Sequence, residues 1–470
     1  MSQFQMDKGV MENVTENISV ASFNGDSLSP LDGRYHNKTK DLRQFFSEKA
    51  YVSYRKSVEL KYFWFLCKFL PELKELFSEG CVYVPWNEFH KNITDEEFTK
   101  FQELESVLHH DVKSIEYMVK NDIEHFLANK GISDENRKKY IEFVHFGLTS
   151  EDINSTGMML MIQDSVNYMQ THIANAFISI QSIQNKCNIP SLAFTHGQPA
   201  TPILLSDIFQ VYYYRLGKLD MMEAELFSCK FGGATGTLAA HKISYPDIDW
   251  KKKMEEFLMD LGLNREEFTT QVSNYDDLST ILNQYKQICV ILKDMCVDIW
   301  LYISRDYFIQ TKPPGAVGSS TMPHKTNPIN FENAEGNFKL GIHMFEFFAR
   351  ELPVSRLHRD LTGSTVIRNI GVPFGHMLIG IQSLIKGLST IEPNMEVIQR
   401  DLDNHWEVIT EAYQTILRKE GYDKPYEALK TLSNQKITQD ILHSFVDGLD
   451  ISEDVKVYMK TITPHNYYGK

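Results

Sequence analysis

The chain has 470 residues, with 48 lysines and arginines against 62 aspartates and glutamates, so its formal net charge is −14. This balance argues against a broad surface for nucleic acids or membranes, while a locally basic site would still accept a small anion. Hydrophobic residues make up 42% of the chain, which excludes general disorder and is enough for a large core. The length indicates roughly two to four domains, or one large helical assembly.

The chain shows no sequence signal of an exported or membrane-spanning protein. Residues 1–25 are polar and aperiodic, without the apolar stretch of a signal peptide, and we expect them to form a mobile extension. The longest aromatic-rich apolar run, residues 62–67, is too short to cross a bilayer. None of the six cysteines forms a C-x-x-C pair, so we expect reduced, mostly buried thiols in a cytoplasmic protein.

Helical periodicity dominates after a turn-forming segment at residues 29–35, which contains Pro, Asp and Gly. Long helices are predicted over 155–188, 202–230 and 277–310. In the last of these, apolar residues recur at three- and four-residue steps without Gly or Pro, and a regular helix would be about 50 Å long. Such amphipathic helices need partner helices, which predicts a helical bundle, completed by other subunits. Several shorter helices separated by kinks are the alternative.

Strand signals are sparse, and small and polar residues gather where the helical periodicity stops. These breaks lie at 195–201, 315–328 and 353–365, and loops between long helices are common places for chemistry. No P-loop, H-E-x-x-H zinc helix or G-x-S-x-G elbow is present. The Gly-rich run at 231–236 is not a dinucleotide fingerprint, and we interpret it as a tight turn.

The second break contains Gly-Ser-Ser-Thr-Met-Pro-His-Lys-Thr-Asn-Pro at 318–328. Lys325 and Asn327 could hold a carboxylate, and Ser319 offers a hydroxyl that could act as a base in a site rich in N–H donors and cations. For an arbitrary loop, a Ser/Gly/Pro turn with a solvated lysine would be the better interpretation.

This segment, however, meets all eight fixed positions of G-S-S-x-M-P-x-K-x-N-P, the signature that it shares with the fumarase/aspartase superfamily. Further segments at 29–35, 110–113, 149–152, 195–201 and 355–361 are similar to those of one family within it, the adenylosuccinate lyases, and occur in the same order. The resemblance runs from about residue 27 to the end of the chain.

The resemblance implies a carbon–nitrogen lyase that eliminates fumarate from adenylosuccinate to give AMP, and from SAICAR to give AICAR. It implies no metal and no organic cofactor. Ser319 would be the general base and His196 the general acid, a role that suits an imidazole because its ordinary pKa is about 6.5. Glu332 would pair with His196 and favour the charged ring.

By the same resemblance, Lys325 and Asn327 hold the succinyl carboxylates, and Thr149 and Ser150 donate hydrogen bonds to the same groups. Arg34 is a candidate for bidentate binding of the phosphate. The remaining substrate contacts are Tyr35, His110, Asp111, Gln271, Ser320, Asn333, Arg359, Ser364 and Arg368.

The fold implied by the resemblance is all-α, with three helical domains after the extension. They are an N-terminal domain at 26–148, a central long-helix domain at 149–391 with the signature loop at 315–328, and a C-terminal domain at 392–470. Members of the family form homotetramers with a core of about 20 helices, and three chains contribute to each active site. The overlong amphipathic helices agree with this assembly.

Some interpretations stay open at this point. Another lyase of the superfamily, such as argininosuccinate lyase, and a non-catalytic structural protein with the same fold are the competing functions. His109 is either a surface histidine or a further contact. Glu151 and Asp152 are expected to cap the long helix that follows them.

Overall fold

The computed structural model of the chain describes residues 25–74, 76, 93–219, 226–311, 322 and 325–469. They belong to two compact units: unit 1 is Met1–His145 with Arg368–Ile379, and unit 2 is Phe146–Ile367 with Gly380–Lys470. Helices dominate both units, which confirms the predicted all-α class. The division into three domains stays a prediction. Nearly all of the predicted extension and most of the signature loop lie outside the described residues.

Unit 1 is organised around its longest helix, α4, which packs against α7. The hydroxyl of Ser47 accepts a hydrogen bond from the backbone N–H of Ala50 and thereby caps α4. A capping box between Thr94 and Glu97 starts α6. The helices of unit 1 are α2 (His36–Thr39), the 3-10 helix η1 (Lys40–Leu42), α3 (Arg43–Phe46), α4 (Glu48–Cys67), α6 (Asp95–Leu108), α7 (Asp111–Asn129) and α8 (Asp134–Ile141).

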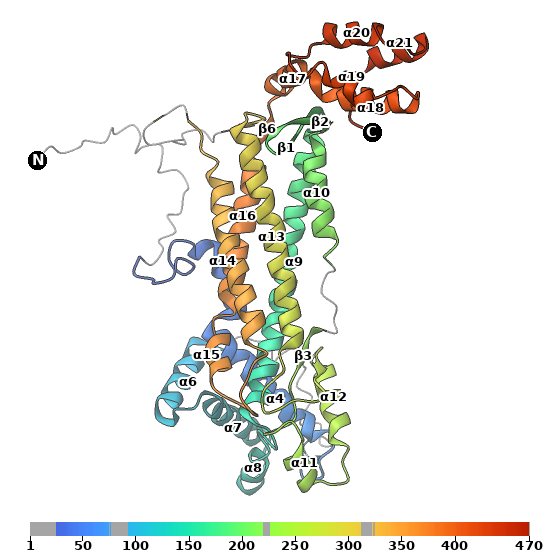
Figure 1. The fold of residues 1–470 in the computed structure, drawn as a ribbon. Coiled ribbons are helices and arrows are strands. Elements are labelled where there is room, and N and C mark those ends of the chain that lie inside the picture. The colour runs from blue at the N-terminus through green and yellow to red at the C-terminus, as the bar shows by residue number, and fades with distance from the viewer. Residues whose placement is uncertain are drawn as a thin grey trace, which may run out of the picture. The chain divides into compact units, whose positions relative to one another are not determined.

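Unit 2 contains a bundle of long helices. Helix α13 packs against α14 and α10, and α10 packs against α9. Their apolar faces bury residues at three- and four-residue steps, as the periodicity predicts. Four of them lie side by side in Figure 1: α9 (Ser150–Lys186), α10 (Ser206–Gly217), α13 (Asp276–Ser304) and α14 (Ile329–Glu351).

A further helix, α16 (Gly371–Leu388), begins in unit 1, and its second half belongs to unit 2. There Gly380 lies against the ring of Phe338 on α14. A Cβ atom added to Gly380 would lie 2.6 Å from that ring. The close approach of the two helices therefore requires the glycine.

Short two-stranded sheets flank the bundle. The hairpin of β1 (Pro190–Thr195) and β2 (Gln198–Leu204) is antiparallel, with an irregularity between Leu192 and Ala193. The other pairs are the parallel strands β3 (Ser228–Cys229) and β4 (Asn264–Arg265), and the antiparallel strands β5 (Phe308–Gln310) and β6 (Ile391–Pro393).

Shorter helices complete unit 2 at both ends of the bundle (Figure 1). One group lies in the segments that connect the long helices: α11 (Ala239–Ser244), α12 (Trp250–Asp260) and α15 (Thr362–Ile367). The C-terminal group, next to the β1–β2 hairpin, comprises α17 (Met395–Asn404), the 3-10 helix η4 (Trp406–Ile409), α18 (Thr410–Lys419), α19 (Pro425–Lys430), α20 (Gln439–Asp447) and α21 (Glu453–Thr461).

The long helices differ from the prediction at their ends. Helix α9 begins five residues earlier than expected, whereas α13 stops at Ser304 because Asp306 takes a left-handed conformation with φ 59°. The helix predicted over 202–230 is wrong at both ends, because α10 covers Ser206–Gly217 and Ser228–Cys229 form β3. Residues 198–204 form β2 instead, where Pro199 and Pro202 are incompatible with a helix interior.

Cysteines of the described residues are buried and unpaired, as expected for reduced thiols. Burial raises the pKa of the Cys187 and Cys229 thiols to about 12, which keeps them protonated and unreactive near neutral pH. The buried free cysteines are Cys67, Cys187, Cys229, Cys289 and Cys296.

Candidate functional site

The predicted site residues fall into three sets, one in unit 1 and two in unit 2. Ser319 and Ser320 lie outside the described residues. The set of unit 1 comprises Arg34, Tyr35, His110, Asp111 and Arg368. The first set of unit 2 comprises Thr149, Ser150, Gln271 and Arg359, near the N-terminus of α9, and Ser364 on α15. The second set of unit 2 comprises His196, Lys325, Asn327, Glu332 and Asn333.

In unit 1, Asp111 lies at the first residue of α7 and binds two arginines. Its Oδ2 lies 2.6 Å from Nη1 of Arg55 and 2.9 Å from Nη2 of Arg368. Nη1 of Arg368 in turn lies 2.6 Å from Oε1 of Glu48. His110 caps α7, because its Nδ1 accepts a hydrogen bond from the backbone N–H of Lys113. The structure therefore brings together three of the predicted residues, Asp111, Arg368 and His110.

Arg55 and Glu48 contact the predicted residues Asp111 and Arg368 but are not among the residues predicted from the sequence. The side chain of Arg55 is 0% exposed, and its guanidinium lies 3.9 Å from the ring centroid of Tyr51. Residues 48, 51 and 55 share one face of α4 because they follow at three- and four-residue steps. Such a spacing is common in helices, so only the contacts with Asp111 and Arg368 distinguish Arg55 and Glu48 from other residues of α4.

The two arginines determine the charge state of Asp111. Burial raises the pKa of this carboxyl, but the charge of Arg55 and its hydrogen bond outweigh burial, so the pKa falls to about 2. Asp111 is therefore ionised at neutral pH. The guanidinium of Arg368, expected to bind the phosphate of the substrate, is already paired with the carboxylates of Glu48 and Asp111.

Arg34 and Tyr35 lie in the turn that precedes α2. The backbone N–H of Tyr35 donates to the carbonyl of Pro30 at 2.8 Å, which folds the segment back on itself. Arg34 is exposed. A pocket of about 360 Å³ in unit 1 is lined by Asp32 of this segment and by Arg368, so the turn and Arg368 border one cavity.

His109 precedes His110 and ends α6. It takes a left-handed conformation with φ 51°, and its backbone N–H donates to the carbonyl of Glu105. The side chain is exposed. Its position at the surface is that of a helix C-cap.

At the N-terminus of α9, Arg359 joins two other residues. Its Nη1 donates to Oε1 of Gln271 at 3.1 Å, and its Nη2 lies 3.3 Å from Oε1 of Glu151. Thr149 is the N-cap of α9, and Ser150 is its first residue. The structure therefore brings together Thr149, Ser150, Gln271 and Arg359. Ser364 lies on α15, which begins shortly after Arg359 in the chain.

The capping role expected for Asp152 is confirmed, because its Oδ2 accepts a hydrogen bond from the backbone N–H of Thr149 at 2.7 Å. Glu151 differs from the expectation. Its carboxylate is 4% exposed and pairs with Arg359, which is a predicted substrate contact. It also places a negative charge in the first turn of α9.

The second set of unit 2 lies around the C-terminal end of α13. His196 occupies the turn between β1 and β2 and takes a left-handed conformation with φ 51°. Oε1 of Glu332 accepts a hydrogen bond from Nε1 of Trp300 at 3.1 Å. The pairing of Glu332 with His196 stays a prediction.

The described part of the signature segment lies beside β5. Nε2 of Gln310 donates to the carbonyl of Thr326 at 2.9 Å, between Lys325 and Asn327. Asn333 connects α14 to α16, because its Oδ1 accepts a hydrogen bond from the hydroxyl of Ser383 on α16 at 2.8 Å.

Helix α9 separates the two sets of unit 2. Its 37 residues correspond to a length of about 55 Å at about 1.5 Å per residue. Thr149 and Ser150 lie at its N-terminus, whereas His196 follows its C-terminus through β1. A single copy of unit 2 therefore does not bring His196 to Thr149 and Arg359.

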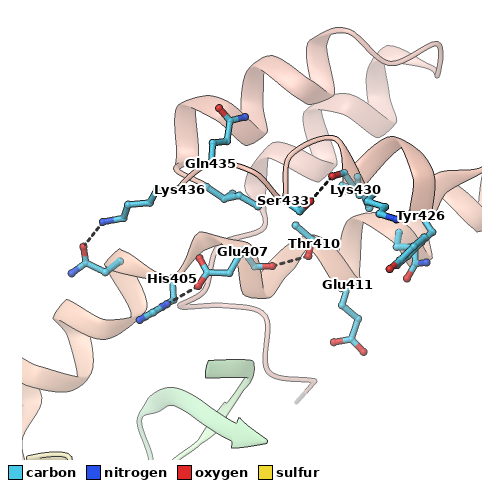
Figure 2. A pocket seen from close by; sticks show the side chains of 13 residues that line it. His405, Glu407, Thr410, Glu411, Tyr426, Lys430, Ser433, Gln435 and Lys436 are labelled. Atoms are coloured by element: carbon cyan, nitrogen blue, oxygen red, sulfur yellow. Dashed lines mark hydrogen bonds and ion pairs between the residues drawn. The ribbon is translucent and has the colours of Figure 1, made fainter. Parts of the chain in front are cut away.

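A pocket of unit 2 contains none of the predicted site residues. It has a volume of about 720 Å³ and lies among the C-terminal helices (Figure 2). His405 and Glu407 in its wall point toward one another, with Nδ1 and Oε1 2.6 Å apart. Glu411, also in the wall, accepts a hydrogen bond from the hydroxyl of Thr201 in β2. The hydrogen bond from Thr201 connects this pocket to the β1–β2 hairpin, which contains His196. No predicted site residue lines the pocket.

Within the described ranges, no group of three or more His, Cys, Asp or Glu side chains is arranged to hold a metal ion. No helix of the same ranges combines the length and apolar character needed to cross a membrane.

Comparison with known proteins identifies the relatives of this chain. A family model described as "Lyase" matches residues 33–339, and one described as "Adenylosuccinate lyase C-terminal" matches residues 355–468. The adenylosuccinate lyase of Dictyostelium discoideum is 43% identical over 97% of this chain and 99% of its own length. Those of Legionella pneumophila (strain Corby) and Escherichia coli (strain K12) are 39% and 36% identical, each over 94% of this chain and 96% of their own.

Solved structures share the fold at lower identity. A fumarate lyase from Mesorhizobium sp. BNC1 superimposes with a TM-score of 0.65 at 15% identity, covering 92% of this chain and 95% of its own. A 3-carboxy-cis,cis-muconate lactonizing enzyme from Pseudomonas putida gives a TM-score of 0.64 at 18% identity, over 92% and 94% of the two chains. The chain therefore belongs to the adenylosuccinate lyase family of the fumarase/aspartase superfamily.

Proposed function

We propose that this protein is an adenylosuccinate lyase, a carbon–nitrogen lyase that cleaves adenylosuccinate to AMP and fumarate by anti β-elimination. The match of residues 355–468 to the C-terminal region of adenylosuccinate lyases carries the proposal. This region contains Arg359, Ser364 and Arg368, the contacts expected for the nucleotide. Cleavage of SAICAR to AICAR follows the same chemistry and is part of the proposal.

The reaction breaks a carbon–nitrogen bond and removes a proton from the neighbouring carbon. Ser319 takes that proton, and His196 gives a proton to the leaving nitrogen, so one proton is removed and one supplied. Negative charge develops beside a succinyl carboxylate. Lys325 and Asn327 hold this group and stabilise the charge. Glu332 orients His196 and favours its cationic form. No metal and no cofactor takes part in the proposed steps.

The proposed enzyme is a homotetramer in which three chains complete each site. The separation of His196 from Thr149 and Arg359 by the length of α9 supports this assembly, because a second chain must supply what one copy of the bundle cannot. Long apolar helix faces need the same partners. We further propose that the protein acts in the cytoplasm on small molecules. A net charge of −14 fits this better than binding to nucleic acid or a membrane.

A substrate comparison tests the proposal. Purified protein is mixed with adenylosuccinate or with argininosuccinate, and the ultraviolet absorbance and the fumarate released are followed. We expect turnover of adenylosuccinate, with AMP and fumarate formed in equal amounts. Turnover of argininosuccinate alone would assign the chain to another lyase of the superfamily. A folded protein that turns over neither substrate would be a non-catalytic relative, and the proposal would be wrong.

A further inference from the structure

The Gly-rich turn at residues 231–236 meets the first turn of α9 around one carboxylate. Oδ1 of Asp152 accepts hydrogen bonds from the backbone N–H groups of Gly232 and Gly233, at 2.7 and 3.1 Å. The same oxygen lies 2.8 Å from Nζ of Lys230. Oδ2 accepts from the backbone N–H of Thr149. The carboxylate of Asp152 therefore joins the Gly-rich turn to the segment that contains two predicted substrate contacts.

This junction is fully enclosed. The side chains of Asp152 and Lys230 are both 0% exposed. Burial lowers the pKa of Lys230, and the neighbouring Asp152 opposes this effect. Lys230 also donates to the carbonyl of Gly233 at 2.6 Å. A buried ion pair of this kind is costly to desolvate and stays paired because each charge needs the other.

The Gly-rich turn also reaches the other predicted contacts. The carbonyl of Ala234 accepts a hydrogen bond from Nε2 of Gln271 at 3.0 Å. Oε1 of Gln271 accepts from Arg359, and Arg359 pairs with Glu151. Glu151 is bonded directly to Asp152 in the chain. The interactions therefore form a closed circuit from Asp152 through the turn, Gln271, Arg359 and Glu151 back to Asp152.

Two glycines of the turn have no room for a larger side chain. Gly236 has φ +76°, and a Cβ atom there would lie 2.3 Å from the carbonyl oxygen of Thr269. Gly233 has the same φ. The glycines thus allow the backbone to approach both Asp152 and the segment before Gln271.

We infer that Glu151, Asp152 and Lys230 are positioning residues that set the geometry of the substrate contacts before the substrate binds. Glu151 holds Arg359 directly, and the buried ion pair holds the turn that binds Gln271. Pre-arranged side chains lose less conformational entropy on binding, so the circuit improves substrate affinity. The inference rests on the proposed function, because Gln271 and Arg359 are contacts of that reaction.

A double-mutant cycle tests the action of Glu151 through Arg359. We expect Glu151→Gln to raise KM for adenylosuccinate about tenfold with kcat changed less than about threefold, because an anchored arginine contributes to substrate binding throughout the reaction. In an Arg359→Ala background, Glu151→Gln should change kcat/KM less than about twofold. Effects that simply multiply in the double variant, or a lower KM in Glu151→Gln, would overturn the inference.

Amide hydrogen exchange, together with steady-state kinetics, tests the ion pair. In the full-length protein, the amides of Gly232 and Gly233 should be strongly protected. Asp152→Asn and Lys230→Met should each lose that protection at the turn and raise KM about tenfold while the bundle helices stay protected. Unchanged protection of the turn in both variants would overturn the inference.

Ser155→Ala is the matched control, because the hydroxyl of Ser155 accepts a buried hydrogen bond from the backbone of Lys230 without taking part in the circuit. It should lower the melting temperature but leave KM within about twofold of the wild type. An equal rise in KM in this control would mean that any loosening of the region has the same effect, which would contradict the inference. Absence of turnover in the wild type would remove the proposed function, while hydrogen exchange would still decide whether the circuit exists.

Discussion

Nη2 of Arg305 donates a hydrogen bond to the carbonyl oxygen of Gly197 at 2.7 Å. This contact connects the residue after α13 to the turn of the β1–β2 hairpin. The guanidinium also lies 4.0 Å from the ring centroid of Phe194 on β1. His196 lies between these two contacts in a left-handed conformation that non-glycine residues rarely adopt. Arg305 therefore holds the backbone of the proposed general acid in place.

Replacing Arg305 should slow the reaction without weakening substrate binding. We expect Arg305→Met to lower kcat about tenfold and to leave KM within about twofold, because the histidine loses its alignment with the leaving nitrogen. Steady-state kinetics measures both constants. The control is Arg215→Met, which removes an arginine that pairs with Asp294 on α13 and lies over Tyr212. Equal losses of kcat in the two variants would contradict the role of Arg305.

Ser319→Ala and His196→Ala test the two proposed proton-transfer residues. Each should lower kcat by at least about 10²-fold, because the variant lacks the group that removes or supplies a proton. Single-turnover measurements with adenylosuccinate separate this step from product release. A near-normal rate in either variant would remove that residue from its proposed role.

Two arginines that bind Asp111 should differ in their contribution to stability. Arg55 is 0% exposed, so Arg55→Met should reduce the free energy of unfolding by about 3–5 kcal/mol. Arg368 is 41% exposed, and Arg368→Met should cost less than about 1 kcal/mol while raising KM. Urea unfolding and steady-state kinetics measure the two effects. The reverse order of stabilities would contradict the structural role of Arg55.

His241 should make unit 2 less stable as the pH falls below 6.5. The ring is fully buried, and burial lowers its pKa to about 4, although Asp152 opposes this effect. Between about pH 6.5 and 4 the unfolded chain binds a proton that the folded chain does not, so stability decreases toward acid by up to roughly 3 kcal/mol. Above pH 6.5 the ring is neutral in both states and the effect is absent.

The pH dependence is measured as the urea midpoint of unfolding between pH 7 and 4.5. His241→Phe should have a smaller slope than the wild type. Identical slopes in the wild type and His241→Phe would contradict the effect expected from the burial of His241.

The all-α class and the long helices could be predicted because periodicity extends over many turns of α9 and α13. The residues at which these helices begin and end could not be predicted in this way. The stop of α13 depends on the left-handed Asp306, and β2 forms because its prolines disfavour a helix while β1 lies beside it. These are effects of a few residues and of tertiary pairing, which periodicity does not report.

Candidate site residues could be named from their motifs, but their supporting contacts could not. Glu48 and Arg55 lie in a helix with no motif, and their importance follows from the position of Asp111 in the fold. The Gly-rich run at 231–236 was expected to be a tight turn, but its contacts with Asp152 and Gln271 come from segments distant in the sequence. Spacing along one element predicts neighbours within it, whereas contacts between loops depend on how the elements pack.

In the proposed enzyme, one catalytic site combines residues from opposite ends of unit 2, supplied by different chains. His196→Ala and Arg359→Ala subunits with different affinity tags are produced together, and oligomers that contain both tags are isolated and assayed with adenylosuccinate. Each variant alone should be nearly inactive, whereas the hybrids should regain about a quarter of the wild-type rate, because random assembly gives that share of sites both intact residues. Hybrids as inactive as the single variants would show that both residues of a site come from one chain and would contradict the account.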